Sequence, residues 1–321
     1  MWPTPWNCAV AESPHAGAAY ANVFRDMGRP LWVSAWGSHV LVRDIPGSER
    51  QDAVGCYPLA AFGDAPDLMG GLSFLKSEGM VSVGLVPDPL ASPSAPALQA
   101  AYPVCIPFKT HYLVTQPSQA HYSKHHRYEI KRARTLVTTQ EVPLAEHLPA
   151  WNALYGHLTD RHGISGLSAL SPDAFSRLTE VLGLRTVVAI ADGEIVSMHL
   201  WIVDETRGAA LSLLAASNAE GYARSAAYAV NDESIRLFSD LQTINLGGAA
   251  GLSDDVNDGL AKFKRGFANE TVQTVFCGAV LDDEGFSELA PGGPFTVTPF
   301  PAYRFPAGHR PALVASAERS R

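Results

Sequence analysis

The stretch Asn245-Leu246-Gly247-Gly248, followed after a variable loop by Gly259-Leu260-Ala261-Lys262-Phe263-Lys264-Arg265-Gly266-Phe267, is the most specific pattern in this sequence. The run Thr243–Leu246 predicts a short strand that enters the glycine pair, and Gly259–Phe267 predicts a helix. Phe263 and Phe267 stand at positions i and i+4, so they lie on one face of that helix and anchor it. The order strand, glycine pair and helix is typical of an α/β domain.

Upstream of this stretch, the sequence predicts a three-stranded antiparallel meander over residues 186–216. Thr186–Ile190 and Glu194–Val203 are apolar runs separated by Asp192-Gly193, a strong hairpin signal. Glu205–Gly208 reads as a second turn, and Ala209–Ala216 as the third strand.

Helices are predicted on both sides of the meander. Leu148, Trp151, Leu154, Tyr155 and Leu158 fall on one helical face. A second helix begins at Ser171-Pro172, with serine as N-cap and proline at the first helical position, and continues inward through Phe175, Leu178 and Leu182. A third helix is predicted from about Gly221 to Asp240, and Thr271–Cys277 predicts a closing strand. The predicted order of elements resembles that of a GNAT-type α/β domain: two helices, three strands, a helix, a strand, a helix and a strand.

The first half of the chain repeats this order more weakly. A helix is predicted over about Val10–Met27, and strands over Pro30–Trp36, His39–Asp44, Val54–Ala61 and Met80–Val86, which suggests an internal duplication. Pro89–Ala101 reads as a connector with one helical turn. The predicted organisation is an N-terminal degenerate GNAT-like domain (1–115), a C-terminal GNAT domain (116–280) and a Pro/Gly-rich tail (281–321) that is an extended wrap or partly disordered.

Three stretches together resemble the FemABX family. The first is the glycine pair and helix described above, similar to the family's G-L-x-x-F-K-x-G-F box. The second, His126–Ala133, is similar to an R-x-N-I-R-x-A helix, and the third, Thr159–Ile164, to a K-R-D-G-F stretch. The resemblance covers roughly residues 105–277 and implies two tandem GNAT-like domains, each with a mixed, mostly antiparallel sheet flanked by helices. It further implies that an acceptor amine, held in a cleft, attacks the ester of an aminoacyl-tRNA. No metal, cofactor or covalent enzyme intermediate is expected.

The resemblance assigns the main site residues. Lys264 matches the lysine of the box and is the expected catalytic residue, contacting the ester oxyanion or the acceptor-end phosphates of tRNA. The alternative is a solvated helix lysine. Arg161 matches an arginine that faces phosphate on the acceptor, which suits a guanidinium fork; the alternative is a surface ion pair with Asp160 or a nearby carboxylate. His162 stands where the family has aspartate, which leaves the acceptor open.

A basic stripe is predicted on the helix that contains Lys124, Arg127, Lys131 and Arg134, spaced i, i+3, i+7 and i+10. With Arg265, these side chains are the expected tRNA phosphate contacts. The alternative is a solvated helix face with local ion pairs.

The helix opening Gly221–Ala227 lies where coenzyme-A-dependent GNAT enzymes bind pyrophosphate, yet the inner glycines of their loop are absent. This argues against acetyl-CoA as donor. Arg224, Tyr222, His199 and Trp201 complete the expected substrate site, with His199 as a possible base or a packed strand residue.

Composition limits the remaining choices. With 46% hydrophobic and 17% charged residues the chain is globular, and its net charge of −8 argues against a DNA-binding protein. No apolar run approaches the roughly 20 residues that span a bilayer, and no signal peptide is evident, so a cytoplasmic protein without membrane insertion is expected. The four cysteines lie far apart in the sequence, which predicts dispersed, mostly buried thiols without a zinc site or disulfide framework.

The function expected is aminoacyl-tRNA-dependent transfer of an amino acid to an amine of a small acceptor, a peptidoglycan precursor or a natural-product intermediate. One alternative is an acyl-CoA- or carrier-protein-dependent N-acyltransferase on the same fold, since fold does not fix function. A second alternative is a non-catalytic binding module.

Overall fold

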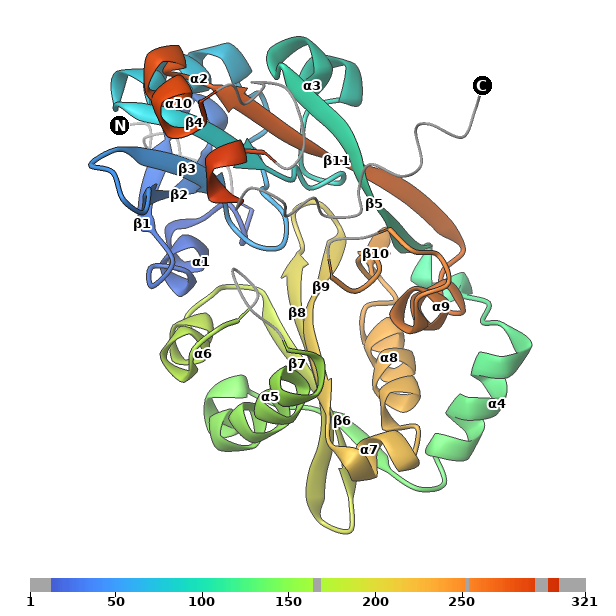
Figure 1. Cartoon of the computed structure of the whole chain (residues 1–321). Helices are drawn as coiled ribbons and strands as arrows, with labels where there is room; N and C mark the ends of the chain where they lie inside the picture. Colours follow the sequence, from blue (N-terminus) through green and yellow to red (C-terminus); the bar gives the residue numbers. More distant parts are fainter. Residues whose placement is uncertain (1–12, 164–168, 252–253, 292–299, 306–321) are drawn as a thin grey trace, which may run out of the picture.

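The computed structural model describes residues 13–163, 169–251, 254–291 and 300–305. Within them, eleven strands form one sheet in the order β1-β2-β3-β4-β11-β5-β10-β9-β8-β7-β6. The strands are β1 (Arg29–Val33), β2 (Ser38–Asp44), β3 (Gln51–Gly55), β4 (Met80–Leu85), β5 (Val104–Thr115), β6 (Thr138–Glu141), β7 (Leu184–Ala191), β8 (Glu194–Asp204), β9 (Ala209–Ser217), β10 (Thr243–Asn245) and β11 (Glu270–Val280). Figure 1 shows the long strands β5 and β11 running side by side between the two halves.

Helices cover the sheet on both faces because alternate residues of each strand point to opposite sides. The helices are α1 (Ala18–Val23), α2 (Leu68–Ser77), α3 (Ala95–Ala101), α4 (Lys124–Ala133), α5 (Leu148–His162), α6 (Pro172–Leu178), α7 (Ala219–Ala223), α8 (Ala226–Leu237), α9 (Gly259–Arg265) and α10 (Asp283–Leu289). On β8, Met198 and Leu200 join the core under α1, α5 and α6, whereas Trp201 and Val203 join the core under α8 and α9. Figure 1 shows these two groups of helices on either side of β7–β9.

The two halves repeat one topology. Strands β1, β2 and β3 are antiparallel, and β4 pairs parallel with β3 after α2. Strands β7, β8 and β9 are likewise antiparallel, and β10 pairs parallel with β9 after α7 and α8. The α/β fold with a mixed, mostly antiparallel sheet flanked by helices is confirmed. The domain limits 1–115 and 116–280 stay a prediction, since β5 joins the halves by pairing with both β10 and β11.

The meander is confirmed to within two residues at each end. Asp192 and Gly193 have positive φ values of 51° and 85°, as a tight hairpin turn requires. The predicted helices at 148–158 and 171 onward are also present, the latter capped by Ser171 Oγ, which accepts from Ala174 N at 3.1 Å. It ends at Leu178, short of Leu182.

Other predicted elements differ from the structure. The predicted helix over Gly221–Asp240 is two helices, because Ser225 adopts a left-handed conformation (φ 54°) that ends α7 and begins α8. The predicted helix over Val10–Met27 is reduced to α1, and residues 10–12 lie outside the described residues. The predicted strands over Val54–Ala61 and Pro30–Trp36 are wrong in extent, since the observed strands are β3 and β1.

The C-terminal tail is only partly described, because residues 292–299 and 306–321 of the predicted wrap lie outside the described residues. Its described part contains α10 and a short 3-10 turn, Ala302–Arg304, and Phe286 and Phe300 pack together in an apolar cluster. No helix in the described part of the chain is long and apolar enough to cross a membrane.

The cysteines are less dispersed than the sequence suggests. Cys105 on β5 and Cys277 on β11 pair directly across the two strands as free thiols, and Cys277 Sγ donates a hydrogen bond to Cys105 Sγ at 3.8 Å. Separation in sequence hid this proximity, because β5 and β11 come from opposite ends of the chain. Cys56 is buried elsewhere, and Cys8 lies outside the described residues.

Candidate functional site

The turn that follows β10 receives the side chain of Lys264. Gly247 has a φ of +79°, a conformation that favours glycine, and an added Cβ there would lie 3.0 Å from Lys264 Nζ. Lys264 is half-buried on α9, and its ammonium donates to the carbonyl oxygen of Gly248 at 2.8 Å. Helix α9 is capped by Asp258, whose carboxylate accepts from Leu260 N and Ala261 N at 3.0 and 3.1 Å. The predicted motif thus points its lysine back onto its own glycine turn.

A second lysine, which the sequence analysis missed, holds the same turn from β5. Lys109 is buried and donates from Nζ to the carbonyl oxygens of Ala249, at 2.8 Å, and Gly251. Next to it, Thr110 donates from N and Oγ1 to the carboxylate of Asp254, at 2.9 and 2.8 Å. The turn and Asp254 therefore lie against β5.

The two ammonium groups share a poorly solvated site. Burial, and then the neighbouring charge of Lys109, lower the pKa of Lys264 from 10.5 to about 7, against the opposing effect of Asp258. Burial likewise lowers the pKa of Lys109. The charges of Asp254 and Asp258 only partly offset this effect of burial on the two lysines. A partly desolvated pair of cations favours the binding of an anion, because an anion relieves their mutual repulsion.

Two histidines near this pair are neutral at ordinary pH. Burial and the charge of Lys264 lower the pKa of His111 to about 4 and that of His199 to about 3. His111 Nδ1 lies 3.1 Å from Asn245 Oδ1, which also accepts from Gly247 N at 2.9 Å. Because an amide oxygen only accepts, His111 carries its proton on Nδ1. Asn245 therefore links the end of β10 to the turn and to β5.

His199 lies where β9 and β10 separate. β10 ends at Asn245, which pairs with Leu211, whereas β9 continues through Ser217. His199 Nε2 and Ser212 Oγ are hydrogen-bonded at 2.8 Å, and the rings of His199 and Trp201 lie 4.0 Å apart. Both side chains are buried. His199 Nδ1 and Trp201 Nε1 have no hydrogen-bond partner among the described residues.

The other predicted substrate residues form a separate group at α5 and α7. The Arg161 guanidinium stacks on the Tyr222 ring, 4.3 Å from its centroid. Arg224 instead forms ion pairs with Asp192, at 2.5 Å, and with Glu220. Ile164 of the predicted Thr159–Ile164 stretch lies outside the described residues.

The predicted basic stripe lies on the exposed face of α4, opposite the buried His126, Ile130 and Ala133. Arg134 forms an ion pair with Asp232, and Arg127 donates to the carbonyl oxygen of Tyr122 at 2.6 Å. Of the predicted tRNA contacts, Lys124, Lys131 and, on α9, Arg265 are exposed and form no ion pair with a described residue. In the stripe, the two arginines thus bond to neighbouring residues, whereas the two lysines form no ion pair with a described residue.

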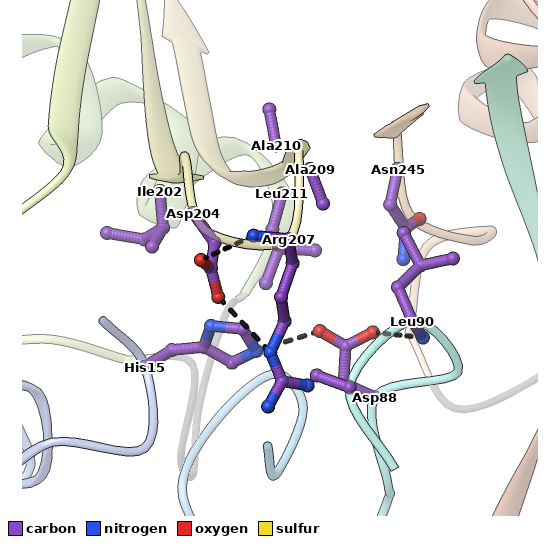
Figure 2. A pocket seen from close by; sticks show the side chains of 11 residues that line it. His15, Asp88, Leu90, Ile202, Asp204, Arg207, Ala209, Ala210, Leu211 and Asn245 are labelled. Carbon is purple, nitrogen blue, oxygen red and sulfur yellow. Dashed lines mark hydrogen bonds and ion pairs between the residues drawn. The ribbon is translucent and has the colours of Figure 1, made fainter. Parts of the chain in front are cut away.

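A small polar cavity lies between the two halves, next to Asn245. Its volume is about 10 Å³, which is room for a single water. Figure 2 shows Asn245 facing it from the end of β10, opposite Leu90 and the loop of Asp88. Asn245 Nδ2 is buried and has no hydrogen-bond partner among the described residues, so one water here would satisfy it.

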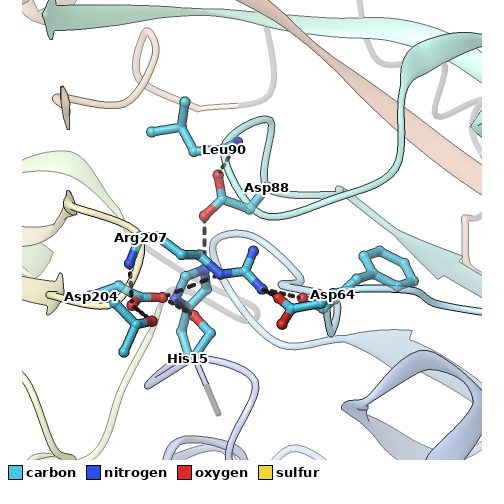
Figure 3. A network of polar contacts seen from close by, with 9 residues as sticks. His15, Asp64, Asp88, Leu90, Asp204 and Arg207 are labelled. Carbon is cyan, nitrogen blue, oxygen red and sulfur yellow. Dashed lines mark hydrogen bonds and ion pairs between the residues drawn. The ribbon is translucent and has the colours of Figure 1, made fainter. Parts of the chain in front are cut away.

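A network of polar contacts beside this cavity joins the N-terminal segment to the β8–β9 turn (Figure 3). Ser13 Oγ donates to Asp204 at 2.6 Å, and His15 Nε2 lies 2.7 Å from Asp88 Oδ2. Arg207 donates to the carbonyl oxygen of Phe62 at 2.9 Å and lies 3.6 Å from the Asp204 carboxylate. These contacts connect both halves of the chain through buried side chains.

Among the described residues, no group of three or more His, Cys, Asp or Glu side chains is arranged to hold a metal ion.

Comparisons with known proteins concern the fold. No protein-family model matches the sequence, and no curated protein matches it. The structure is similar to that of FemX, at 13% identity and a TM-score of 0.62, covering 86% of this chain and 94% of FemX. It is also similar to the C-terminal domain (DUF2156) of a putative lysylphosphatidylglycerol synthetase from Agrobacterium fabrum (14% identity, TM-score 0.58, covering 83% of this chain and 89% of that one). A third similar structure is L-PGS from Bacillus licheniformis (13% identity, TM-score 0.56, covering 83% and 92%). At these identities the chain shares the fold of FemX and of the lysylphosphatidylglycerol synthetase domain over most of its length.

Proposed function

We propose that this chain is an aminoacyl-tRNA-dependent transferase that forms an amide bond on the amine of a small acceptor. The single observation that carries the proposal is the Lys264 ammonium, half-buried and held on the glycine turn after β10. The fold shared with FemX and with the lysylphosphatidylglycerol synthetase domain supports it.

In the proposed reaction, the acceptor amine attacks the ester carbonyl carbon of the aminoacyl-tRNA. A carbon–nitrogen bond forms and the carbon–oxygen bond to the ribose breaks. The amine proton passes, directly or through solvent, to the departing ribose oxygen, which leaves as a hydroxyl. Negative charge develops on the carbonyl oxygen before the ester bond breaks. Lys264 is the proposed source of positive charge for this oxyanion or for a phosphate next to the ester.

The loop before α8 favours tRNA over coenzyme A as the donor. An added Cβ at Gly221 would lie 2.2 Å from the carbonyl oxygen of Val196, so this glycine is required for packing against β8. Its amide donates to Asn218 Oδ1 at 2.9 Å, and the amides of Tyr222, Arg224 and Ser225 donate to carbonyl oxygens of the same turn. A pyrophosphate would need free amides, and these four are engaged, which lowers the support for the coenzyme-A-dependent alternative at this turn.

The donor class is tested by mixing the purified chain with radiolabelled aminoacyl-tRNA, prepared by charging total bacterial tRNA, and with a panel of small amines and cell extract. RNase-sensitive transfer of label into an amide is the expected result. Transfer from acetyl-CoA or another acyl-CoA, without transfer from any tRNA, would contradict the proposal and favour the alternative.

A further inference from the structure

Two lysines from distant parts of the chain bind neighbouring carbonyls of one turn. Lys264 of α9 binds Gly248, and Lys109 of β5 binds Ala249 and Gly251. Lys109 is only 9% exposed, which is unusual for a lysine. Among the described residues its hydrogen-bond partners are backbone carbonyls and no carboxylate, although the charges of Asp254 and Asp258 act on it. A buried ammonium held in this way calls for an explanation beyond surface charge.

The backbone of Lys109 is held at an irregularity in the sheet. The β5–β11 register shifts between Gln273 and Val275, opposite Lys109. Thr274 Oγ1 fills the gap by accepting from Lys109 N at 3.1 Å and donating to Lys109 O at 2.9 Å. Such bulges redirect side chains and are common next to active sites. Here the irregularity coincides with the residue that reaches the turn.

The turn lies closely on this part of β5. An added Cβ at Gly248 would lie 3.0 Å from the carbonyl oxygen of Thr110 and 3.3 Å from Lys109 Cβ. Asp254, bound to Thr110, fixes the loop farther on. The position of the Gly248 carbonyl, and with it that of Lys264 Nζ, is therefore set from β5.

We propose that Lys109 is a positioning residue for the transfer reaction: it fixes the turn 247–251 so that the Gly248 carbonyl holds the Lys264 ammonium in place. The effect of Lys109 on the catalytic rate rests on the proposed function, whereas its effect on the Lys264 ammonium does not. Lys109 also places a second positive charge beside Lys264, where the anion of the donor is expected.

The charged groups around Lys264 determine how removal of Lys109 changes the pKa of Lys264. The groups that act on Lys264 or on its neighbours are Lys109 and His111 from β5, His199 from β8, Asp258 at the start of α9, and Asp254, whose charge favours the charged form of Lys109. Both histidines are neutral, and Asp258 favours the charged lysine. Loss of the Lys109 charge therefore raises the pKa of Lys264 and moves its titration to higher pH.

The test compares Lys109→Met, which keeps the length without charge, with Lys109→Arg and with Lys76→Met, an exposed lysine of α2. The extent of reductive methylation of Lys264 is measured by mass spectrometry from pH 5 to pH 10. In Lys109→Met the midpoint moves to higher pH, whereas it stays in Lys109→Arg and Lys76→Met. An unchanged midpoint in a folded Lys109→Met protein would overturn the proposal.

Transfer activity supplies the second measurement. Lys109→Met lowers kcat for transfer by about 10- to 100-fold, as expected when a reacting group is slightly misplaced, with the alkaline limb of its pH profile moved upward. Lys109→Arg partly restores kcat. If Lys109→Met does not fold, Thr274→Val removes the hydrogen bonds that anchor the Lys109 backbone and leaves the Lys109 charge in place, and the same loss of kcat is expected; full activity of Thr274→Val would contradict the proposal. If the wild-type chain transfers nothing from tRNA, the proposed function fails, whereas the methylation result still decides the role of Lys109.

Discussion

At the scale of single residues, the burial of the Lys264 ammonium, which the proposed function uses, lowers the stability of the folded chain. Its pKa in the folded chain, about 7, lies well below its ordinary value of 10.5. Between these values the unfolded chain binds more protons, so the free energy of unfolding rises with pH across this window. The penalty for burying the ammonium is fully present below about pH 7 and is lost as the pH approaches 10.5.

Lys264→Met removes this penalty. We expect its gain in free energy of unfolding over the wild type to be about 1–2 kcal/mol larger at pH 6 than at pH 9. Urea unfolding at the two pH values measures the difference, with Lys262→Met, an exposed lysine of the same helix, as the control. An equal effect of Lys264→Met at both pH values would show that Lys264 is not desolvated.

At the scale of elements, α9 and α4 are joined by one tight contact. His126 of α4 forms two hydrogen bonds. Its Nδ1 lies 2.9 Å from Ser123 Oγ, and its Nε2 lies 2.8 Å from the carbonyl oxygen of Phe263 on α9. The ring also lies on Gly266, where an added Cβ would be 1.9 Å from His126 Cε1. His126 is thus a packing residue between the two helices.

Gly266→Ala tests this contact. We expect a loss of about 1–3 kcal/mol in the free energy of unfolding, because the buried ring has to move. Gly156→Ala in α5 is the matched control: nothing lies within 4 Å of its added Cβ, and a gain of about 0.5–1 kcal/mol is expected. Equal effects of the two substitutions, measured by denaturant unfolding, would refute the packing argument.

The exposed face of α4 carries the proposed tRNA contacts. Lys131→Glu is expected to weaken binding of aminoacyl-tRNA about 3- to 10-fold at moderate salt and to reduce the salt dependence of binding. Lys76→Glu makes the same charge change on α2. Filter binding over a series of salt concentrations distinguishes the two variants, and equal loss in both would assign the effect to net charge alone.

The sequence predicted some elements and not others for identifiable reasons. The meander was predictable because Asp192-Gly193 separates two apolar runs of strand length. Strand β5 was not predicted, since Pro107, Lys109 and His111 interrupt its apolar pattern. Lys264 could be chosen from its motif, whereas Lys109 could not, because only the pairing of β5 with β10 and β11 brings it to the turn.

At the scale of the whole molecule, the continuous sheet and the polar network next to the cavity hold the halves together. Asp204 is buried; burial alone would raise its pKa, but hydrogen bonds from Ser13 and Thr206 and the charge of Arg207 lower it overall. Its contribution to stability is therefore present above pH 3.8 and is lost as the pH falls through the lowered folded value.

A double-mutant cycle on Ser13 and Asp204 measures this coupling. We expect Asp204→Ala to cost about 2–3 kcal/mol and Ser13→Ala about 1–2 kcal/mol in the free energy of unfolding, with the double variant losing less than the sum. Additive losses would mean that the hydrogen bond does not couple the N-terminal segment to the β8–β9 turn.

The central claim is that Lys264, on its glycine turn, serves transfer from aminoacyl-tRNA. The most direct measurement is the single-turnover rate of RNase-sensitive label transfer by the wild type, Lys264→Met and Lys262→Met. The account predicts a loss of about 100-fold or more for Lys264→Met, comparable to the loss of an oxyanion-stabilising group, and an unchanged rate for Lys262→Met. An equal rate in Lys264→Met and the wild type would contradict it.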